Sequence, residues 1–331
     1  MPALVYDTNT TAFELVSDYK SIIQDKTILI TGASPGSLGG HYAQNIAKAN
    51  PACIILAGRN TTKLEQCTKE IQVASPKVKI RTLKLDLSSL QSTRDAAAEV
   101  VNNWDDIPVI DVLVNNAGIM APEYGVSVEG FESQFATNHL GPFLFTNLIM
   151  TKILKSTSPR IVMVASDGHR LSPLRFDDYN FDGGDTYDKW VAYGQSKTAN
   201  MLMALSLANK LGIKHGLLAF SIHPGVILTN LGSHLDWDDV DVKGLWSTDR
   251  RLGNAEGWRT SFDFKTPERG VATHVYASFD PLLKANNGAY LIDSHIADYL
   301  QDTLKPWATS GFEAERLWRL SENLVGEKFP Y

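Results

Sequence analysis

The chain has 331 residues but only two cysteines, Cys53 and Cys67, and they do not form a Cys-x-x-Cys pair. Cys53 lies in an apolar run and Cys67 in a polar helical stretch, so we expect no structural disulfide. No apolar run approaches the roughly 20 residues that a membrane-spanning helix needs. The first residues lack the basic start and apolar stretch of a secretory signal. We therefore expect a cytoplasmic protein with no membrane span.

The sequence also lacks an excess of basic charge. It carries 31 Lys and Arg against 37 Asp and Glu, a formal net charge of -6. Such a balance provides no field to attract nucleic acid, and any phosphate site must be built locally from backbone N–H groups and a few placed cations. No HExxH motif, paired Cys/His spacing or GxxxxGK[ST] loop occurs, so we expect no metal. Gly32–Gly36 matches a GxSxG elbow, but Pro35 lacks the N–H that a serine hydrolase needs there.

What the sequence does contain is a series of short apolar runs that alternate with amphipathic segments, typical of strands buried on both faces of a parallel sheet. Hydrophobic residues make up 44% of the chain, as in ordinary globular proteins. The alternation predicts a Rossmann-type, doubly wound α/β fold with three α/β/α layers. The expected strands are 27–31, 52–57, 78–83, 109–114, 160–165 and 217–222.

Three regions interrupt this alternation. Residues 1–25 are interpreted as an N-terminal extension with one helix over 12–23, before a single domain at 26–331. Residues 167–192 are rich in Asp, Gly and Tyr and predict a long loop. Residues 229–265 carry three tryptophans among polar residues, and we expect this excursion to cover the substrate. The alternative is a surface excursion that packs on itself.

A glycine-rich turn follows the first expected strand and precedes a helical stretch. Strand, turn and helix in this order predict a dinucleotide site, because glycines permit a tight turn and the helix N-terminus offers free N–H groups to a pyrophosphate. An ordinary turn is the alternative. The candidate cofactor-binding residues here are Gly32, Ser34, Gly36, Ser37, Leu38 and Gly39.

The end of the second strand suggests which dinucleotide is bound. NAD sites usually place an acidic residue there, for the ribose 2′-hydroxyl. Here the segment reads Leu-Ala-Gly-Arg-Asn, so Arg59 stands where a 2′-phosphate could be gripped. A solvated surface arginine is the alternative. We predict NADP(H) as the cofactor.

Tyr193 and Lys197 lie four residues apart at the start of an expected helix, so both face one side. An ammonium close to a phenol is expected to lower the phenol pKa, which makes the pair a credible proton donor and acceptor for a carbonyl/alcohol couple. YxxxK alone is a common pattern. Ser166 and Asn115–Gly118, however, follow two other expected strands, where ligands collect in such sheets.

Taken together, these motifs resemble the short-chain dehydrogenase/reductase family over about residues 26–291, in the retinol-dehydrogenase-like and WW-domain-oxidoreductase-like branch. Similar chains are common among fungal proteins, often in secondary metabolism. The resemblance implies that Tyr193 is the acid/base, that Ser166 binds the substrate oxygen, that Lys197 holds the nicotinamide ribose and that Asn138 positions a water. It implies cofactor contacts from Asp86, Leu87, Asn116, Ala117, Gly118, Tyr193, Lys197, Pro224, Gly225, Val226 and Thr229. It also implies a homodimer or homotetramer.

Two features depart from the family pattern. Gly36 is followed by Ser37-Leu38-Gly39, one residue more than TGxxxGxG has, which loosens the match of N–H groups to phosphates. The 27-residue spacing between Ser166 and Tyr193 is also longer than in the simplest members.

The predicted function is NADP(H)-dependent interconversion of a ketone or aldehyde and an alcohol on a lipophilic or aromatic small molecule, in the direction of reduction. Candidate pocket residues are Met120, Tyr124, Trp237 and Trp246. The alternatives are a non-catalytic NADP(H)-binding regulator and a non-redox enzyme of this fold that catalyses epimerisation or cyclisation.

Overall fold

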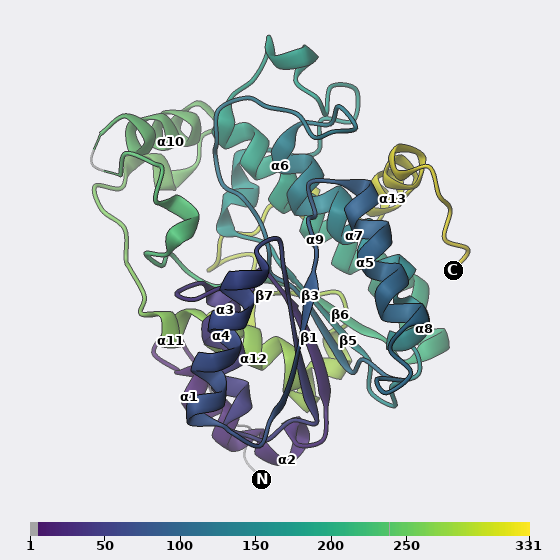
Figure 1. The fold of residues 1–331 in the computed structure, drawn as a ribbon. Helices are drawn as coiled ribbons and strands as arrows, with labels where there is room; N and C mark the ends of the chain where they lie inside the picture. Colours follow the sequence, from purple (N-terminus) through teal and green to yellow (C-terminus); the bar gives the residue numbers. More distant parts are fainter. Residues whose placement is uncertain (1–5, 238) are drawn as a thin grey trace.

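A single eight-stranded sheet forms the centre of the protein, in a computed structural model that describes residues 6–237 and 239–331. The strand order is β3-β2-β1-β4-β5-β6-β7-β8; β1 to β7 are parallel and β8 is antiparallel (Figure 1). The expected doubly wound sheet is confirmed. The strands are β1 (Thr27–Thr31), β2 (Cys53–Gly58), β3 (Lys79–Lys84), β4 (Val112–Asn115), β5 (Arg160–Val164), β6 (Leu218–His223), β7 (Tyr290–Ile292) and β8 (His295–Ile296).

Helices cover both faces of the sheet, so the three-layer prediction is also confirmed (Figure 1). One face is covered by α5 (Leu90–Asn102), α7 (Gly141–Leu148), α8 (Met150–Ile153) and α9 (Lys189–His215), with α13 (Gly311–Val325) packed on α9. The other face is covered by α1 (Ala12–Asp18), α2 (Lys20–Ile23), α3 (Leu38–Ala47), α4 (Thr61–Ala74) and α12 (Ala272–Phe279). The short helices α6 (Ser133–Phe135) and α11 (Pro267–Gly270) complete the connections.

The strand β1 shows why continuous apolar runs form this sheet. Leu29 belongs to the core beneath α5, α7 and α9, whereas Ile28 and Ile30 belong to the core beneath α3, α4 and α12. Side chains alternate between the faces of a strand, so only a strand covered on both sides needs apolar residues at every position. The strand β4 begins three residues later than expected, because the N–H of Ile110 bonds to Lys152 instead of joining the ladder.

The described N-terminal segment, from Tyr6, packs on the helix layer that contains α3 and α12. A capping box formed by Thr11 and Glu14 starts α1, whose apolar side chains join the core between α3 and α12. The Tyr19 hydroxyl donates a 2.6 Å hydrogen bond to Asp280. The single helix expected over 12–23 is interrupted at Tyr19, which separates α1 from α2.

The long loop between β5 and α9 contains two 3₁₀ turns, Asp167–Leu171 and Asp182–Gly184. It ends earlier than expected, since α9 begins at Lys189. The Asp188 carboxylate caps this helix by accepting hydrogen bonds from the N–H groups of Trp190 and Val191. The helix then runs to His215 and ends at Gly216, which has a φ of 67°.

The 229–265 excursion contains the helix α10 (Val240–Arg251), which lies away from the two helix layers, beyond one end of the sheet (Figure 1). A small apolar cluster beneath it joins Leu235 and Leu245 to Leu171 and Trp190. This helix was not expected, because apolar residues are too sparse in its sequence to show a helical period.

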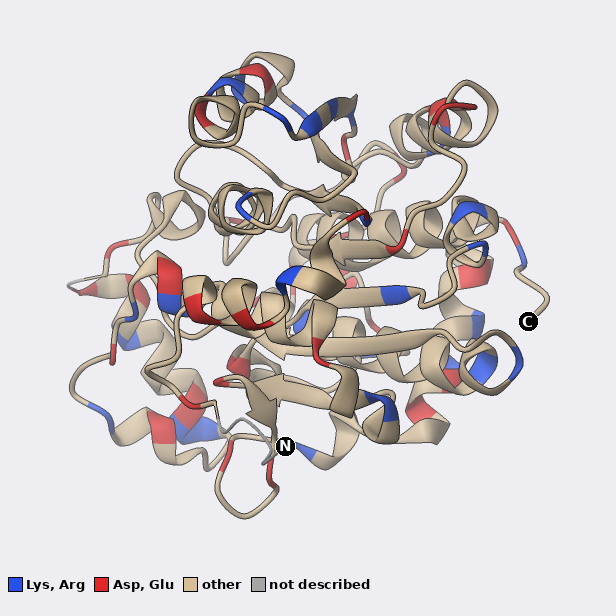
Figure 2. Cartoon of the chain, turned by 90° about the horizontal axis from the view of Figure 1, so that it is seen from below, with Lys and Arg blue, Asp and Glu red and all other residues tan. Residues whose placement is uncertain are grey.

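Charged residues surround the two cores without forming a field of one sign. Lys and Arg lie interspersed with Asp and Glu around the outer helices and loops in the view of Figure 2. Among the described residues, no helix combines the length and apolar character that crossing a membrane would require.

Two isoleucines test the importance of the core beneath α5, α7, α8 and α9. Ile153 in α8 has no exposed surface, whereas Ile213 in α9 is fully exposed. We expect Ile153→Ala to lower the free energy of unfolding by about 2–5 kcal/mol, because it leaves a cavity in a close-packed interior. The matched Ile213→Ala should change it by less than about 0.5 kcal/mol. Urea unfolding followed by circular dichroism measures both; equal losses would contradict the assignment of Ile153 to a rigid core.

Candidate active site

A cavity of about 460 Å³ lies at the carboxyl ends of the strands. Its walls come from the residues after β1, β2, β4, β5 and β6 and from the 229–265 excursion. The order of the sheet reverses between β1 and β4, and open α/β sheets bind their ligands in the crevice at this kind of switch point. The cavity therefore lies where the fold itself favours a ligand.

Most of the residues selected from the sequence meet in this cavity. Three do not line it: Gly36, Gly39 and Asn138. A Cβ on Gly39 would lie 2.8 Å from the backbone oxygen of Gly32, so this glycine permits close packing of α3. Gly36 has a φ of 72° and shapes the turn. The residues that line the cavity are Gly32, Ser34, Ser37, Leu38, Arg59, Asp86, Leu87, Asn116, Ala117, Gly118, Ser166, Tyr193, Lys197, Pro224, Gly225, Val226 and Thr229.

Two features shape the turn between β1 and α3. Ser37 caps α3: its Oγ accepts hydrogen bonds from the N–H groups of Ser34 (3.0 Å) and Gly40 (3.1 Å). Gly32 has a φ of 72°, and a Cβ there would lie 2.8 Å from the Cα of Ala117. The extra residue of the turn is thus absorbed by the cap, and the first N–H groups of α3 remain available at the cavity.

Two cations stand at the β2 end of the cavity. Arg59 and Lys63 both line it, both are exposed, and neither forms an ion pair with another described residue. Asn60 brings them together, because its side chain caps α4 by accepting from the N–H of Lys63 at 3.0 Å. Sequence reasoning missed Lys63. The signal was a lysine four residues after Arg59, at the start of a capped helix.

Tyr193, Lys197 and Ser166 come from two neighbouring elements. Tyr193 and Lys197 lie one turn apart on α9, with the Nζ of Lys197 5.5 Å from the centre of the Tyr193 ring. That Nζ donates a 3.1 Å hydrogen bond to the backbone oxygen of Val164, the last residue of β5. Ser166 follows two residues later, and a hydrogen bond links its side chain to Tyr193.

Burial dominates the ionisation of this pair. It raises the pKa of Tyr193 to about 12, although the hydrogen bond between Tyr193 and Ser166 opposes the rise. It also lowers the pKa of Lys197 to about 8. The expectation that Lys197 lowers the Tyr193 pKa is therefore wrong for this arrangement, because desolvation of the phenol outweighs the stabilising groups around it.

Asn138 lies in a π-helical turn, Ala136–Leu140, behind the cavity. Its Nδ2 donates to the oxygen of Ile119 and to the Oγ of Ser196, both at 2.9 Å, and its Oδ1 accepts from the N–H of Ile119 at 2.8 Å. Both donors of the amide are therefore used by protein groups. The side chain fastens the segment after β4 to α9.

The excursion and the segment after β4 supply an apolar wall. Met120, Trp237 and Trp246 line the cavity, as the sequence suggested, and Phe262 stacks on Trp246 with 6.0 Å between ring centres. Tyr124 does not line it: its ring packs edge-to-face on Tyr187, outside the cavity. The proximity of Tyr124 to the predicted site in sequence was therefore misleading.

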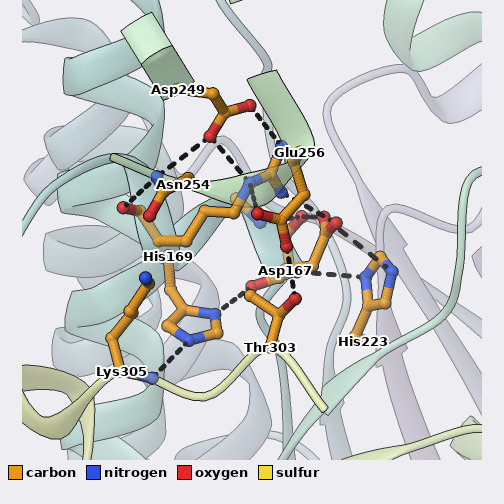
Figure 3. Close-up of polar contacts among 11 residues, drawn as sticks. Asp167, His169, His223, Asp249, Asn254, Glu256, Thr303 and Lys305 are labelled. Atoms are coloured by element: carbon orange, nitrogen blue, oxygen red, sulfur yellow. Dashed lines mark hydrogen bonds and ion pairs between the residues drawn. The ribbon is translucent and has the colours of Figure 1, made fainter. Parts of the chain in front are cut away.

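A network of buried charges behind Ser166 was also missed. Asp167 and Arg170 line the cavity, and Arg170 is paired with Asp249 of α10 (Figure 3). These residues lie far apart in the sequence, which carries no signal that joins Arg170 to Asp249.

The buried ammonium of Lys197 makes a prediction for stability. Its pKa of about 8 lies below the usual 10.5, so folding is penalised while the amine is charged; the penalty is full below pH 8 and vanishes above about 10.5. We expect Lys197→Met to raise the free energy of unfolding at pH 7 by about 2–3 kcal/mol, less the lost hydrogen bond to Val164. Denaturant unfolding at pH 7 and pH 10 measures this, and a gain that does not shrink with pH would contradict it.

Comparison with known proteins agrees with this geometry. The family model for short chain dehydrogenase matches residues 26–239. Human retinol dehydrogenase 14 is 34% identical over 92% of this chain and 88% of its own length. The oxidoreductase calI of Penicillium decumbens is 33% identical over 91% of this chain and 87% of its own.

Solved structures share the fold. An uncharacterised protein from Mycobacterium paratuberculosis superposes with a TM-score of 0.69 and 29% identity, over 93% of this chain and 96% of that one. A short chain dehydrogenase from Escherichia coli CFT073, solved in complex with NADPH, has a TM-score of 0.60 and 21% identity, over 83% of this chain and 98% of that one. With the strand order, the cavity and the Tyr193–Lys197 pair, these matches establish that the chain belongs to the short chain dehydrogenase family of oxidoreductases.

Proposed function

We propose that this protein uses NADP(H) to interconvert a ketone or aldehyde and an alcohol on a lipophilic or aromatic small molecule, in the direction of reduction. One observation carries the proposal: Tyr193, Lys197 and Ser166 line the same cavity as the turn from Gly32 to Leu38. In this proposal residues 26–331 form the catalytic domain, and residues 1–25 are an extension whose described part, from Tyr6, packs on it.

The chemistry of the cavity walls fits a phosphorylated dinucleotide. The glycine at position 32 and the cap at Ser37 leave room and N–H groups for a pyrophosphate. Arg59 and Lys63 offer two cations at the β2 end that pair with no acidic group of the described residues, which suits a 2′-phosphate better than a 2′-hydroxyl. The E. coli structure of the same fold holds NADPH, the cofactor proposed here.

The nicotinamide would supply the hydride to the carbonyl carbon. Tyr193 would donate its hydroxyl proton to the oxygen as negative charge develops there, and Ser166 would hold that oxygen by a hydrogen bond. A pKa of about 12 keeps the phenol of Tyr193 protonated at neutral pH, which favours its use as an acid. Lys197, whose pKa burial lowers to about 8, can then return a proton to Tyr193 near neutral pH.

The substrate class is inferred from the apolar wall that the excursion and the segment after β4 provide. Met120, Trp237, Trp246 and Phe262 present apolar and aromatic surface to the cavity. Such a wall favours a lipophilic or aromatic molecule, with orientation left to a few polar groups. Relatives named retinol dehydrogenase carry a lipophilic alcohol in their name.

The first test is a titration of the purified protein with NADPH and with NADH, followed by ketones and aldehydes in the presence of the preferred cofactor. We expect preference for NADPH and oxidation of NADPH on addition of a carbonyl substrate. NADPH binding without turnover of any carbonyl would favour the regulator. Substrate conversion without net NADPH consumption would favour epimerisation or cyclisation.

Replacing the proposed acid should separate chemistry from binding. We expect Tyr193→Phe to reduce kcat by at least about 100-fold, because the variant has no proton to donate. Its Kd for NADPH should stay near that of the wild type, since the ring that packs in the cavity remains. Steady-state kinetics and a fluorescence titration measure the two quantities, and full activity in this variant would rule out the mechanism.

The two cations at the β2 end should determine cofactor choice. We expect Arg59→Ala and Lys63→Ala each to weaken NADPH binding by about 10- to 100-fold, because each removes a charged contact to the 2′-phosphate. NADH binding should change little. Lys69→Ala, on the same helix as Lys63 but outside the cavity, is the matched control. Equal losses for both cofactors would contradict the 2′-phosphate assignment.

A further inference from the structure

A chain of polar contacts runs from Ser166 into the 229–265 excursion. Figure 3 shows its members Asp167, Asp249 and Glu256. The Ser166 hydroxyl donates a 3.2 Å hydrogen bond to Oδ1 of Asp167. The Oδ2 of Asp167 lies 2.8 Å from Nη1 of Arg170, whose side chain is only 5% exposed. The segment is a 3₁₀ turn whose first N–H groups bond back to Ser166, so these three residues form one local unit.

Arg170 is held from the other side by α10. Its Nε and Nη2 bind the two carboxylate oxygens of Asp249 at 2.9 and 2.8 Å, and Asp249 is fully buried. Asn254 closes the arrangement, because its Nδ2 donates to Asp249 at 3.0 Å and to the backbone oxygen of Arg170 at 3.2 Å. A planar two-point pair of this kind fixes direction as well as distance.

A second carboxylate of the excursion completes the network. Glu256 lies 3.8 Å from Nε of Arg170 and accepts a 2.6 Å hydrogen bond from Thr303. Buried ion pairs are a weak means of stabilising a fold, since their desolvation offsets most of their attraction. The position of this one, adjoining Ser166 and lining the cavity, is better explained by a need to place groups.

The network stays charged over the physiological range. Burial alone would raise the pKa of Asp167, but Arg170, followed by His223 and His169, holds it well below its usual value. Burial would lower the pKa of Arg170, but Asp167 and Asp249 hold it above its usual value. Burial lowers the pKa values of both histidines.

We propose that Asp167 and Arg170 are positioning residues for Ser166, and that Asp249 of α10 anchors them. Without substrate, the Asp167 carboxylate accepts the single Ser166 proton and so fixes the position of Oγ; the proton turns to the substrate oxygen when that oxygen binds. Arg170 prevents the carboxylate from turning away. Because Asp249 belongs to the helix that covers the substrate side, the hydroxyl and the substrate wall are set in one fixed relation. This inference rests on the proposed function.

Asp167 and Arg170 carry opposite charges beside Tyr193, so replacing each should shift the pH dependence of catalysis in opposite directions. Asp167 disfavours the Tyr193 phenolate and Arg170 favours it. Lys197 on the same helix and Tyr290 on β7 also interact with Tyr193, and the titratable His223 and Glu256 line the same cavity. Replacing Asp167 should therefore lower the pH at which Tyr193 can act as a base, and replacing Arg170 should raise it.

The kinetic test is the pH profile of kcat/KM for alcohol oxidation in Asp167→Asn and Arg170→Met. We expect the rising limb to move by about one pH unit to lower pH in the first variant and by about one unit to higher pH in the second. We expect Asp249→Asn to lower kcat/KM about tenfold, since it weakens the anchor while preserving its shape. Arg251→Met is the control, because Arg251 also ties α10 to the α9 segment, through an exposed pair with Asp188.

A second measurement on the same variants needs no turnover. The N–H groups of Gly168 and His169 are bonded to Ser166, so hydrogen exchange over residues 167–171 reports whether the unit is held. We expect faster exchange there in Asp249→Asn but not in Arg251→Met.

The outcomes separate the two proposals. Limb shifts of opposite sign, with faster exchange in Asp249→Asn, support the inference. Limb shifts of the same sign, or unchanged exchange in Asp249→Asn, overturn it while leaving the proposed function intact. Absence of NADPH-dependent turnover in the wild type would overturn the proposed function, and the exchange measurement would then decide whether Asp249 holds the turn.

Discussion

The packing of α9 against the end of β5 is the contact on which the site depends. Lys197 and Asn200 both donate to the backbone oxygen of Val164, at 3.1 and 3.2 Å. A Cβ at Gly194 would lie 2.8 Å from Leu171, and one at Gly168 would lie 2.8 Å from the Tyr193 ring. Two elements that are 24 residues apart in the chain, at Val164 and Asp188, are thereby brought close enough for Ser166 and Tyr193 to share a hydrogen bond.

The packing of α9 against β5 also explains why the site contains buried ionisable groups that lower the stability of the fold. Although both line the cavity, this close packing leaves Tyr193 and Lys197 only 6% and 4% exposed. Both side chains then lose hydration, which moves the Lys197 pKa down and the Tyr193 pKa up. The lysine that is costly for stability is thus the one whose proton becomes exchangeable near neutral pH.

The sheet and most of the cavity wall could be predicted because their signals are local. Buried parallel strands need apolar residues at every position, and residues at the carboxyl ends of such strands must meet at one edge. The helix α10 could not be predicted, since it is held by pairs such as Arg170–Asp249 and carries few apolar side chains. The sign of the Tyr193 shift was missed for a related reason: the sequence shows the nearby charge of Lys197 but not the degree of burial.

The helix α10 differs from the rest of the molecule in how it is attached. The cores on the two faces of the sheet are continuous and apolar, whereas the cluster beneath α10 is small and its main ties are polar. Substitutions in its cavity-facing side chains therefore leave both cores undisturbed. Under the proposed function, substrate choice and fold stability are encoded in largely separate parts of the chain, so a lineage could change the molecule it acts on without having to rebuild the scaffold that performs the chemistry.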